Sequence, residues 1–224
     1  MRITMLGPDD TDWIIKLEQR SFIPALQATR QMMLRRFEFG HLMYGLIEGN
    51  ELVGMLGVSY GRFDPDDFGS FPRTEHEYGM QAVPANYNAV FTYNLEVEPS
   101  SRGREHSKAL FQAAIDRAKR EGCAYGIGCS RIPSYAGSDP QNTQEAFPHS
   151  PEFKDSIDRY LQGGPFPTLA ELTKDPLLAL YYRLGEPAQC KFHWIIPNFA
   201  THDHASGGIR VILYGETRNW HSSE

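Results

Sequence analysis

The chain has 224 residues, with 41% hydrophobic, 12% aromatic and 22% charged residues. This composition excludes a wholly disordered protein, and the length allows a buried core without disulfides or metals. The net charge of −6 argues against a general nucleic-acid binder, because phosphate binding needs a basic surface. Cys123, Cys129 and Cys190 form no CxxC motif, and we find neither a membrane-spanning run nor a signal-peptide core. We therefore expect a cytoplasmic protein without nucleic-acid or membrane partners.

Hydrophobic periodicity predicts alternating strands and helices in the first half of the chain. A Gly49-Asn50 dipeptide is typical of a tight hairpin between two of these strands. Residues 64–87 form a long loop rich in Gly, Pro and Asp, of the kind that often shapes a site. The elements expected here are a strand at 2–6, a helix from Thr11, a helix at 24–40, strands at 41–47 and 52–60, and a strand at 89–97.

The second half continues the alternation around an insertion at residues 133–174. Asp175 followed by Pro176 predicts a capped helix start, and Gly122 is placed to end an amphipathic helix. The elements expected here are that helix with its apolar face at 110–118, a strand at 124–132, a helix at 151–161, a helix at 176–184, and strands at 190–199 and 209–215. No linker divides the chain, so residues 1–224 are expected to form one domain of mixed α/β (α+β) class.

The junction between the 89–97 strand and the following helix is rich in basic residues. Arg102, Gly103, Arg104 and Lys108 surround the expected start of the helix. A helix N-terminus offers unpaired N–H groups and a partial positive charge, which together bind phosphate. The residues alone leave two interpretations open: a phosphate cradle, or a charged helix start that only contacts solvent.

The pattern LxVxPxxRG over residues 95–103, followed by an amphipathic helix, resembles the pyrophosphate-binding motif of the GNAT superfamily of acyl-CoA-dependent N-acyltransferases. The order of elements is also similar to that of the superfamily over nearly the whole chain. Three shorter pieces resemble a subgroup related to GNAT domains fused to nitrilase-like amidohydrolases. These pieces are Arg131-Ile-Pro-Ser-Tyr135, Asp175-Pro-Leu-Leu178 and Ile196-Pro-Asn-Phe199.

The resemblance implies a mostly antiparallel central sheet of six to seven strands, splayed in the middle, with helices on both faces. It implies that backbone amides from Leu95 to Val97 bind the pantetheine arm and polarise the thioester carbonyl. The phosphates of acetyl-CoA or another acyl-CoA would bind at Arg102, Gly103, Arg104, Glu105, His106, Ser107 and Lys108. A small-molecule or peptide amine would then attack the thioester directly in a ternary complex.

The cradle departs from the family pattern at two positions. Glu105 and Ser107 stand where the family has small residues, and Glu105 brings a like charge near a phosphate. This departure keeps two alternatives open. One is an acyl donor, long-chain or polyketide, carried on an acyl carrier protein; the other is a non-catalytic acyl-CoA-binding protein.

Two residues are candidates for proton transfer. By the register of the family, Tyr181 is expected to protonate the leaving thiolate, with Tyr182 next to it as the alternative if the register slips. Glu96 alternates with Leu95 and Val97, so it projects from the opposite face of the strand and could act as the base, directly or through water. For both tyrosines simple packing remains an alternative, and for Glu96 a solvated or salt-bridged carboxylate.

Further residues are expected to line the substrate cleft. Tyr93 and Asn94 precede Glu96 on the same strand, and Arg131 could orient a carboxylate or phosphate or instead hold the insertion. His202 and His204 form a loop pair without a companion ligand motif, so we expect no metal site.

Overall fold

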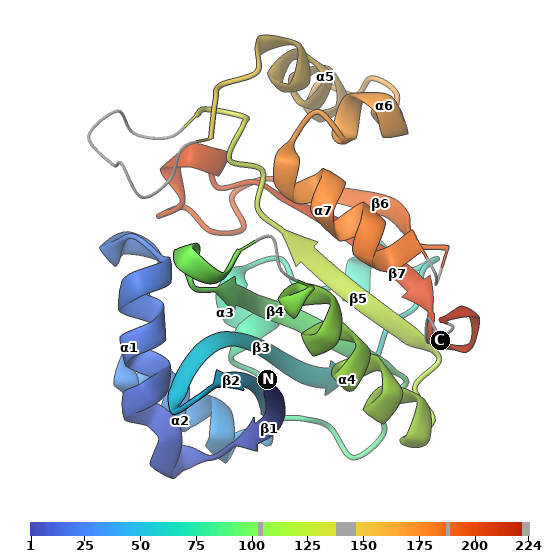
Figure 1. Cartoon of the computed structure of the whole chain (residues 1–224). Coiled ribbons are helices and arrows are strands. Elements are labelled where there is room, and N and C mark those ends of the chain that lie inside the picture. Colours follow the sequence, from blue (N-terminus) through green and yellow to red (C-terminus); the bar gives the residue numbers. More distant parts are fainter. Residues whose placement is uncertain (103–104, 138–146, 187–188, 221–224) are drawn as a thin grey trace.

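The computed structural model describes residues 1–102, 105–137, 147–186 and 189–220. Their strands form one seven-stranded sheet in the order β1-β2-β3-β4-β5-β7-β6, and only β4 and β5 pair in parallel (Figure 1). This confirms the predicted mixed α/β class with a mostly antiparallel sheet. The strands are β1 (Arg2–Leu6), β2 (Leu42–Glu48), β3 (Glu51–Gly61), β4 (Ala89–Val97), β5 (Tyr125–Ser130), β6 (Lys191–Ile196) and β7 (Arg210–Glu216).

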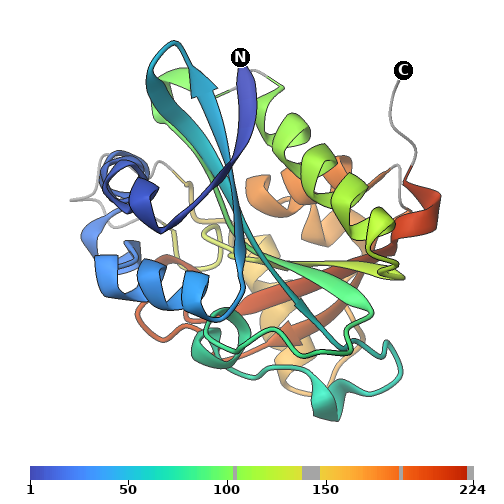
Figure 2. The same cartoon turned by 90° about the horizontal axis from the view of Figure 1, so that it is seen from below.

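Helices cover both faces of the sheet, as predicted. The views in Figures 1 and 2 place α1 and α2 on one side of the strands and α4 with α7 on the other. The helices are α1 (Thr11–Ser21), α2 (Arg30–Glu38), α3 (Glu75–Gly79), α4 (His106–Arg120), α5 (Pro151–Leu161), α6 (Leu169–Leu172) and α7 (Pro176–Gly185). The part of the chain that the structure describes contains no helix long and apolar enough to cross a bilayer.

The helix α4 packs along its predicted apolar face. Leu110, Ala114 and Ala118 are fully buried at helical spacing, in a cluster with Leu56 and other side chains of the central strands. The helix ends before Gly122, which adopts a φ of +78° and donates its amide to the carbonyl of Lys119. The position of α4 across β2, β3 and β4 is therefore set by the sequence pattern.

The predicted helix at 24–40 is wrong in its first third. Pro24–Leu26 form a 3-10 turn, and α2 begins only at Arg30. Thr29 caps α2, because its hydroxyl accepts a hydrogen bond from the amide of Met32 at 3.2 Å. The amide of Ala28, between the two segments, donates instead to the Glu18 carboxylate of α1 at 3.0 Å.

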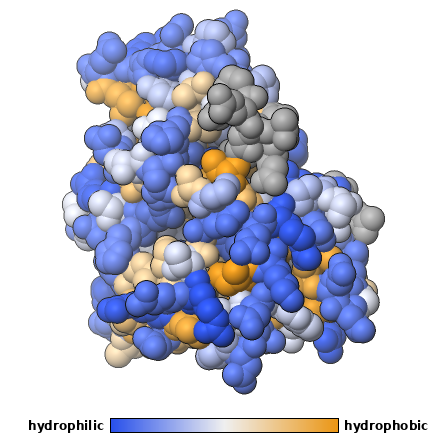
Figure 3. Space-filling view, turned by 90° about the vertical axis from the view of Figure 1, so that its left-hand side faces the viewer, coloured by the Kyte–Doolittle hydropathy of each residue, from blue (hydrophilic) through white to orange (hydrophobic). Residues whose placement is uncertain are grey.

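The loop at 64–87 and the insertion at 133–174 contain short helices that periodicity did not predict, α3 and α6. The loop folds over the sheet because Phe71 and Tyr78 are buried against Phe91 and other aromatic side chains. The surface that carries α1, shown in Figure 3, is mostly hydrophilic with small separate hydrophobic areas. The long loop thus contributes residues to the core.

Asp175 connects the insertion to α7. Its side chain is fully buried, and one oxygen accepts from the amides of Leu177 and Leu178 at 2.9 and 3.1 Å. The other oxygen accepts from the amide of Ser134 at 3.0 Å. The predicted N-cap is confirmed, and the structure adds a second role across the chain.

We expect Asp175→Ala to lower the free energy of unfolding by about 2–4 kcal/mol, because it removes a helix cap and leaves a third buried amide unpaired. Urea denaturation of the purified variant measures this loss. Asp155→Ala, which removes an exposed carboxylate from α5, is the control and should change stability by less than about 0.5 kcal/mol. Equal effects of the two substitutions would contradict the role of Asp175.

Candidate active site

The strands β4 and β5 separate part-way along the sheet. Their parallel pairing ends at Thr92 and Gly128, and among the described residues β4 has no partner on this side from Tyr93 to Val97. Both strands continue beyond this point, so a gap opens between them. The splay implied by the family resemblance is present in the structure.

A β-bulge at Tyr93 accompanies the separation. On β3, Gly57 pairs with Asn94 and the next residue, Val58, pairs with Thr92, so Tyr93 is skipped. The ring of Tyr93 lies over Gly57, where an added Cβ would come within 2.7 Å of the ring. A glycine at position 57 thus gives the bulge the space it needs.

The amides of Leu95 and Val97 face the gap. The amide of Glu98 donates to the carbonyl of Val53 on β3 at 2.8 Å, so the alternation along the strand turns Leu95 and Val97 the other way. The carbonyl of Val97, on the same side, accepts from Nε of Arg102 at 3.2 Å. Within the described ranges neither amide has an acceptor, and both residues line a cleft.

The N-terminus of α4 lies at the same cleft. The intrahelical hydrogen bonds start with the amide of Ala109, which donates to the carbonyl of Glu105 at 3.0 Å. The amides of His106, Ser107 and Lys108 in the first turn therefore have no acceptor within the helix, and the Glu105 side chain does not cap them. A 15-residue helix thus presents an uncapped N-terminus to the cleft.

The residues predicted to bind phosphate differ in which of their groups are accessible to a ligand. The His106 side chain is 4% exposed and lies next to Glu48, with 3.3 Å between Nε2 and Oε1. The His106 side chain is therefore not available to a ligand, and this residue can contribute only its backbone amide. The Lys108 ammonium lies 3.5 Å from the Glu105 carboxylate, and both side chains are exposed. Gly103 and Arg104 lie outside the described residues.

These features open into one cleft with a volume of about 1360 Å³. Most of the residues singled out from the sequence line it together: Tyr93, Asn94, Leu95, Glu96, Val97, Arg102, Glu105, Ser107, Lys108, Arg131 and Tyr181. Several polar residues that the sequence did not single out lie there too: Glu18, Arg36, Glu75, Tyr78 and Arg210.

Glu96 forms a buried carboxyl pair with Glu18 of α1. The two residues are 2% and 1% exposed, and the amide nitrogen of Asn94 donates to both, at 3.4 Å to Glu96 and 2.8 Å to Glu18. The second oxygen of Glu96, Oε2, is buried without a partner in the described part of the chain. Glu96 is therefore neither solvated nor paired with a cation through a direct contact.

Burial, followed by the charge of Glu18, raises the pKa of Glu96 well above its ordinary value. Burial also raises the pKa of Glu18, against the opposing effects of the Ala28 and Asn94 hydrogen bonds and the Arg36 charge. The pair thus favours a shared proton. Glu18 could have been found from the sequence, because it falls on the apolar face of α1 with Ile14 and Leu17.

Tyr181 and Tyr182 lie in different surroundings. Tyr181 lines the cleft and packs edge-on against Phe111 of α4, with 6.1 Å between ring centres. Burial raises the pKa of Tyr181 to about 12, so the phenol keeps its proton at neutral pH. Tyr182 stacks on Phe192 of β6 instead. Of the two, Tyr181 is the one placed to act on a ligand.

Tyr93 is oriented by a hydrogen-bond chain. Nε2 of His41 lies 2.7 Å from the carbonyl of Gln81 and must donate to it, so Nδ1 accepts from the Tyr93 hydroxyl at 3.3 Å. Burial lowers the pKa of His41, which keeps the ring neutral and consistent with this arrangement. The Arg36 guanidinium lies over the Tyr93 ring, 4.7 Å from its centre.

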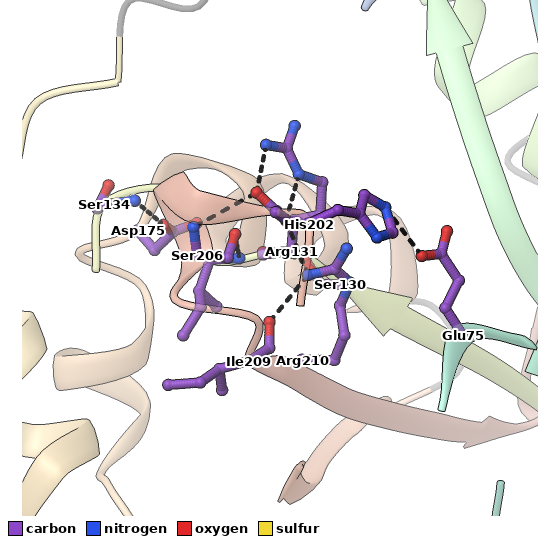
Figure 4. Close-up of polar contacts among 11 residues, drawn as sticks. Glu75, Ser130, Arg131, Ser134, Asp175, His202, Ser206, Ile209 and Arg210 are labelled. Carbon is purple, nitrogen blue, oxygen red and sulfur yellow. Dashed lines mark hydrogen bonds and ion pairs between the residues drawn. The ribbon is translucent and has the colours of Figure 1, made fainter. Parts of the chain in front are cut away.

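Arg131 and Arg210 share the carboxylate of Asp203 (Figure 4). Arg131 binds it through two hydrogen bonds of 2.8 and 2.9 Å, and Arg210 through one of 2.8 Å. Burial alone would raise the pKa of Asp203, but the hydrogen bonds and charges of the two arginines lower it to about 2. Arg131 thus contacts the segment after β6, a partner that the sequence did not predict.

A contact between His202 and Glu75 lies on the same wall of the cleft. Nε2 of His202 is 3.2 Å from Oε2 of Glu75, and both side chains are partly exposed (Figure 4). His202 was considered as a metal ligand from its spacing to His204. Among the described residues, no group of three His, Cys, Asp or Glu side chains is arranged to hold a metal.

Residues 11–134 match the family model described as the acetyltransferase (GNAT) family. The chain belongs to this family. The matched segment contains β4 with its bulge, the start of α4 and β5, so the GNAT match covers the strand separation described above. No curated protein sequence matches the chain.

Solved structures of the GNAT fold superpose over nearly the whole chain. The GphF GNAT-like decarboxylase in complex with isobutyryl-CoA is 22% identical, with a TM-score of 0.70 over 97% of this chain and 100% of that one. The loading GNATL domain of CurA from Lyngbya majuscula is 14% identical, with a TM-score of 0.68 over 97% and 98%. An aminoglycoside 6'-N-acetyltransferase complexed with coenzyme A is 14% identical, with a TM-score of 0.54 over 97% of each chain. At these identities the likeness concerns the fold.

The carboxyl pair makes a pH-dependent prediction. The raised pKa of Glu96 means that the unfolded chain loses this proton before the folded one, so Glu96 costs stability as the pH rises above about 4.5. We expect Glu96→Gln to be stabilising, by an amount that grows on the order of 1 kcal/mol per pH unit above that point. Urea denaturation from pH 5 to pH 8 measures it. Glu51→Gln, at an exposed position of β3, is the control, and a pH-independent effect of Glu96→Gln would contradict the pairing.

Proposed function

We propose that the protein transfers an acyl group, acetyl in the simplest case, from an acyl-CoA to an amine. The observation that carries this proposal is the pair of unpartnered amides at Leu95 and Val97, which face the gap between β4 and β5. Both residues line the cleft, and an extended pantetheine arm would bond to their N–H groups. A thioester carbonyl at the same place would be polarised by a donor that needs no rearrangement.

The phosphate end of the ligand is assigned to the start of α4. The amides of His106, Ser107 and Lys108, which have no acceptor within the helix, and the partial positive charge of the helix suit an anion. Arg102 and the Lys108 ammonium add full charges at the same end of the cleft. Membership in the GNAT family and the coenzyme complexes among its structural neighbours support this assignment.

The remaining residues of the cleft are assigned to the acceptor and to proton transfer. The amine nitrogen attacks the thioester carbon, the carbonyl oxygen gains negative charge against the amides of β4, and the carbon–sulfur bond then breaks. We assign protonation of the leaving thiolate to the Tyr181 phenol, which lines the cleft. The proton lost by the amine passes to the Glu18–Glu96 pair, directly or through water, and from there to solvent, and a proton from solvent restores the Tyr181 phenol.

The direct test is calorimetric titration with coenzyme A and acetyl-CoA, followed by thiol release with a panel of amines. We expect micromolar to millimolar binding and acceptor-dependent turnover. Absence of coenzyme A binding would contradict the proposal. Binding without turnover on any acceptor would favour the non-catalytic alternative named above.

A second candidate function uses an acyl group delivered on a carrier protein. Glu105 favours it, because its exposed carboxylate stands at the N-terminus of α4 where the family has a small residue. A donor with a single phosphate would tolerate this charge better than a pyrophosphate. The fold neighbours that are named a loading domain and a GNAT-like decarboxylase support testing carrier-bound and carboxylated thioesters, with CO₂ release followed beside transfer.

A closer relationship to GNAT domains fused to nitrilase-like amidohydrolases stays a prediction from the sequence. The Arg131–Tyr135 piece begins with the arginine on Asp203, and the Asp175 piece begins with the cap of α7. Both pieces therefore have a structural role that would explain a shared pattern.

The main-chain contacts predict a difference between two substitutions at one position. Ser107→Pro removes an amide of the first helical turn, where proline is tolerated, and should weaken coenzyme A binding about tenfold. Ser107→Ala keeps the amide and should bind within about threefold of the wild type. Calorimetry measures both, with circular dichroism as the check on folding. Equal binding by the two variants would argue against phosphate binding at this turn.

The two tyrosines of α7 offer a matched pair for catalysis. We expect Tyr181→Phe to lower kcat about 10- to 100-fold with little change in the affinity for acyl-CoA, since only a proton donor is lost. Tyr182→Phe should leave kcat unchanged, because that ring stacks on Phe192. Steady-state kinetics with saturating acyl-CoA decides between them, and equal kcat values would remove Tyr181 from the mechanism.

A further inference from the structure

Arg210 lies at the start of β7, on the wall of the cleft formed beyond the end of β5. It pairs with Ile196 of β6, and the next residue, Val211, pairs with Ser130 of β5. Its side chain is 7% exposed and still lines the cleft. A guanidinium in such a place is costly unless its charge and its N–H groups are used.

Only one nitrogen of this guanidinium, Nη1, donates hydrogen bonds to described residues of the protein. Nη1 donates to Oδ2 of Asp203 at 2.8 Å and to the carbonyl of Ile209 at 3.0 Å (Figure 4). Nε and Nη2 have no partner in the ranges that the structure describes. These two nitrogens form one edge of the planar group, with parallel N–H bonds that match the two oxygens of a carboxylate.

Asp203, the partner of Nη1, is itself fixed by further hydrogen bonds. Asp203 is 1% exposed, and it accepts two hydrogen bonds from Arg131 besides the one from Arg210. One carboxylate is thus shared by two guanidinium groups. The free edge of Arg210 carries N–H donors of a permanently charged group, which suits an anion.

We infer that Arg210 is a carboxylate-binding residue, which holds a substrate carboxyl group on its free Nε–Nη2 edge while Asp203 orients its other end. The inference deepens the proposed acyl transfer and rests on it for the identity of the cleft. Two sources can supply the carboxylate. It belongs either to the acceptor, as in an amino acid whose amine is acylated, or to the acyl group, as in a malonyl thioester.

The first experiment measures carboxylate binding without any transfer. Malonate and L-phenylalanine are titrated calorimetrically into the wild type, Arg210→Gln and Arg210→Lys. We expect at least one probe to bind the wild type and to bind both variants about 10- to 100-fold more weakly. The lysine variant keeps an ion pair with Asp203 but lacks the planar edge, so it separates ligand binding from folding. Arg218→Gln, an exposed arginine of equal charge, should bind as the wild type does.

The second experiment identifies the source by pairs that differ in one carboxylate. On the acceptor side the pairs are L-phenylalanine with phenethylamine and L-lysine with cadaverine; on the donor side the pair is malonyl-CoA with acetyl-CoA. We expect kcat/KM to favour the carboxylated member of one side at least tenfold, and Arg210→Gln to abolish that preference. Equal use of all pairs, or a preference that survives in Arg210→Gln, would overturn the inference.

The two proposals fail in different ways. If coenzyme A binds and acyl transfer occurs but neither experiment shows a carboxylate effect, the inference on Arg210 is wrong and the function stands. If coenzyme A does not bind while malonate or L-phenylalanine binds through Arg210, the carboxylate site stands and the proposed donor is wrong. Loss of both results removes both.

Discussion

The separation of β4 from β5 is the constraint on which the rest of the site depends. The amides of a strand inside a sheet normally donate hydrogen bonds to both neighbouring strands. The amides of Leu95 and Val97 instead face the gap between β4 and β5. The bulge at Tyr93, for which Gly57 leaves room, accompanies this separation. Because α4 begins where β4 ends, the uncapped helix N-terminus opens onto the same space. Two sets of unused main-chain donors therefore meet in one cleft.

Charged side chains divide the cleft into regions of different character. The buried carboxyls of Glu18 and Glu96 lie where α1 packs on β4. The guanidinium groups of Arg131 and Arg210 lie beyond the end of β5, held by Asp203. Charges interact strongly in such surroundings because little water screens them. A substrate with an amine and an anionic group would find a complementary partner for each.

Much of the fold follows from local patterns. The predicted bounds of β1, β4 and α5 are those of the structure, and the Asp175 cap and the Gly122 stop are found where proline, glycine and periodicity indicate them. The predicted helix at 24–40 is wrong in its first third because of a tertiary contact. The amide of Ala28 bonds to Glu18, ten residues earlier, and Thr29 starts the helix anew. A contact between helices that cannot be seen in either segment alone interrupted the predicted helix.

The sequence by itself determined the order of elements and the helix that starts after β4, because these depend on neighbours within a few residues. The tertiary structure alone decided which side chains share the cleft. Glu18 meets Glu96, and Arg131 meets Arg210 through Asp203, only because the sheet brings distant segments together. Local periodicity carries no information on such contacts, since their energy comes from burial and charge created by the folded chain.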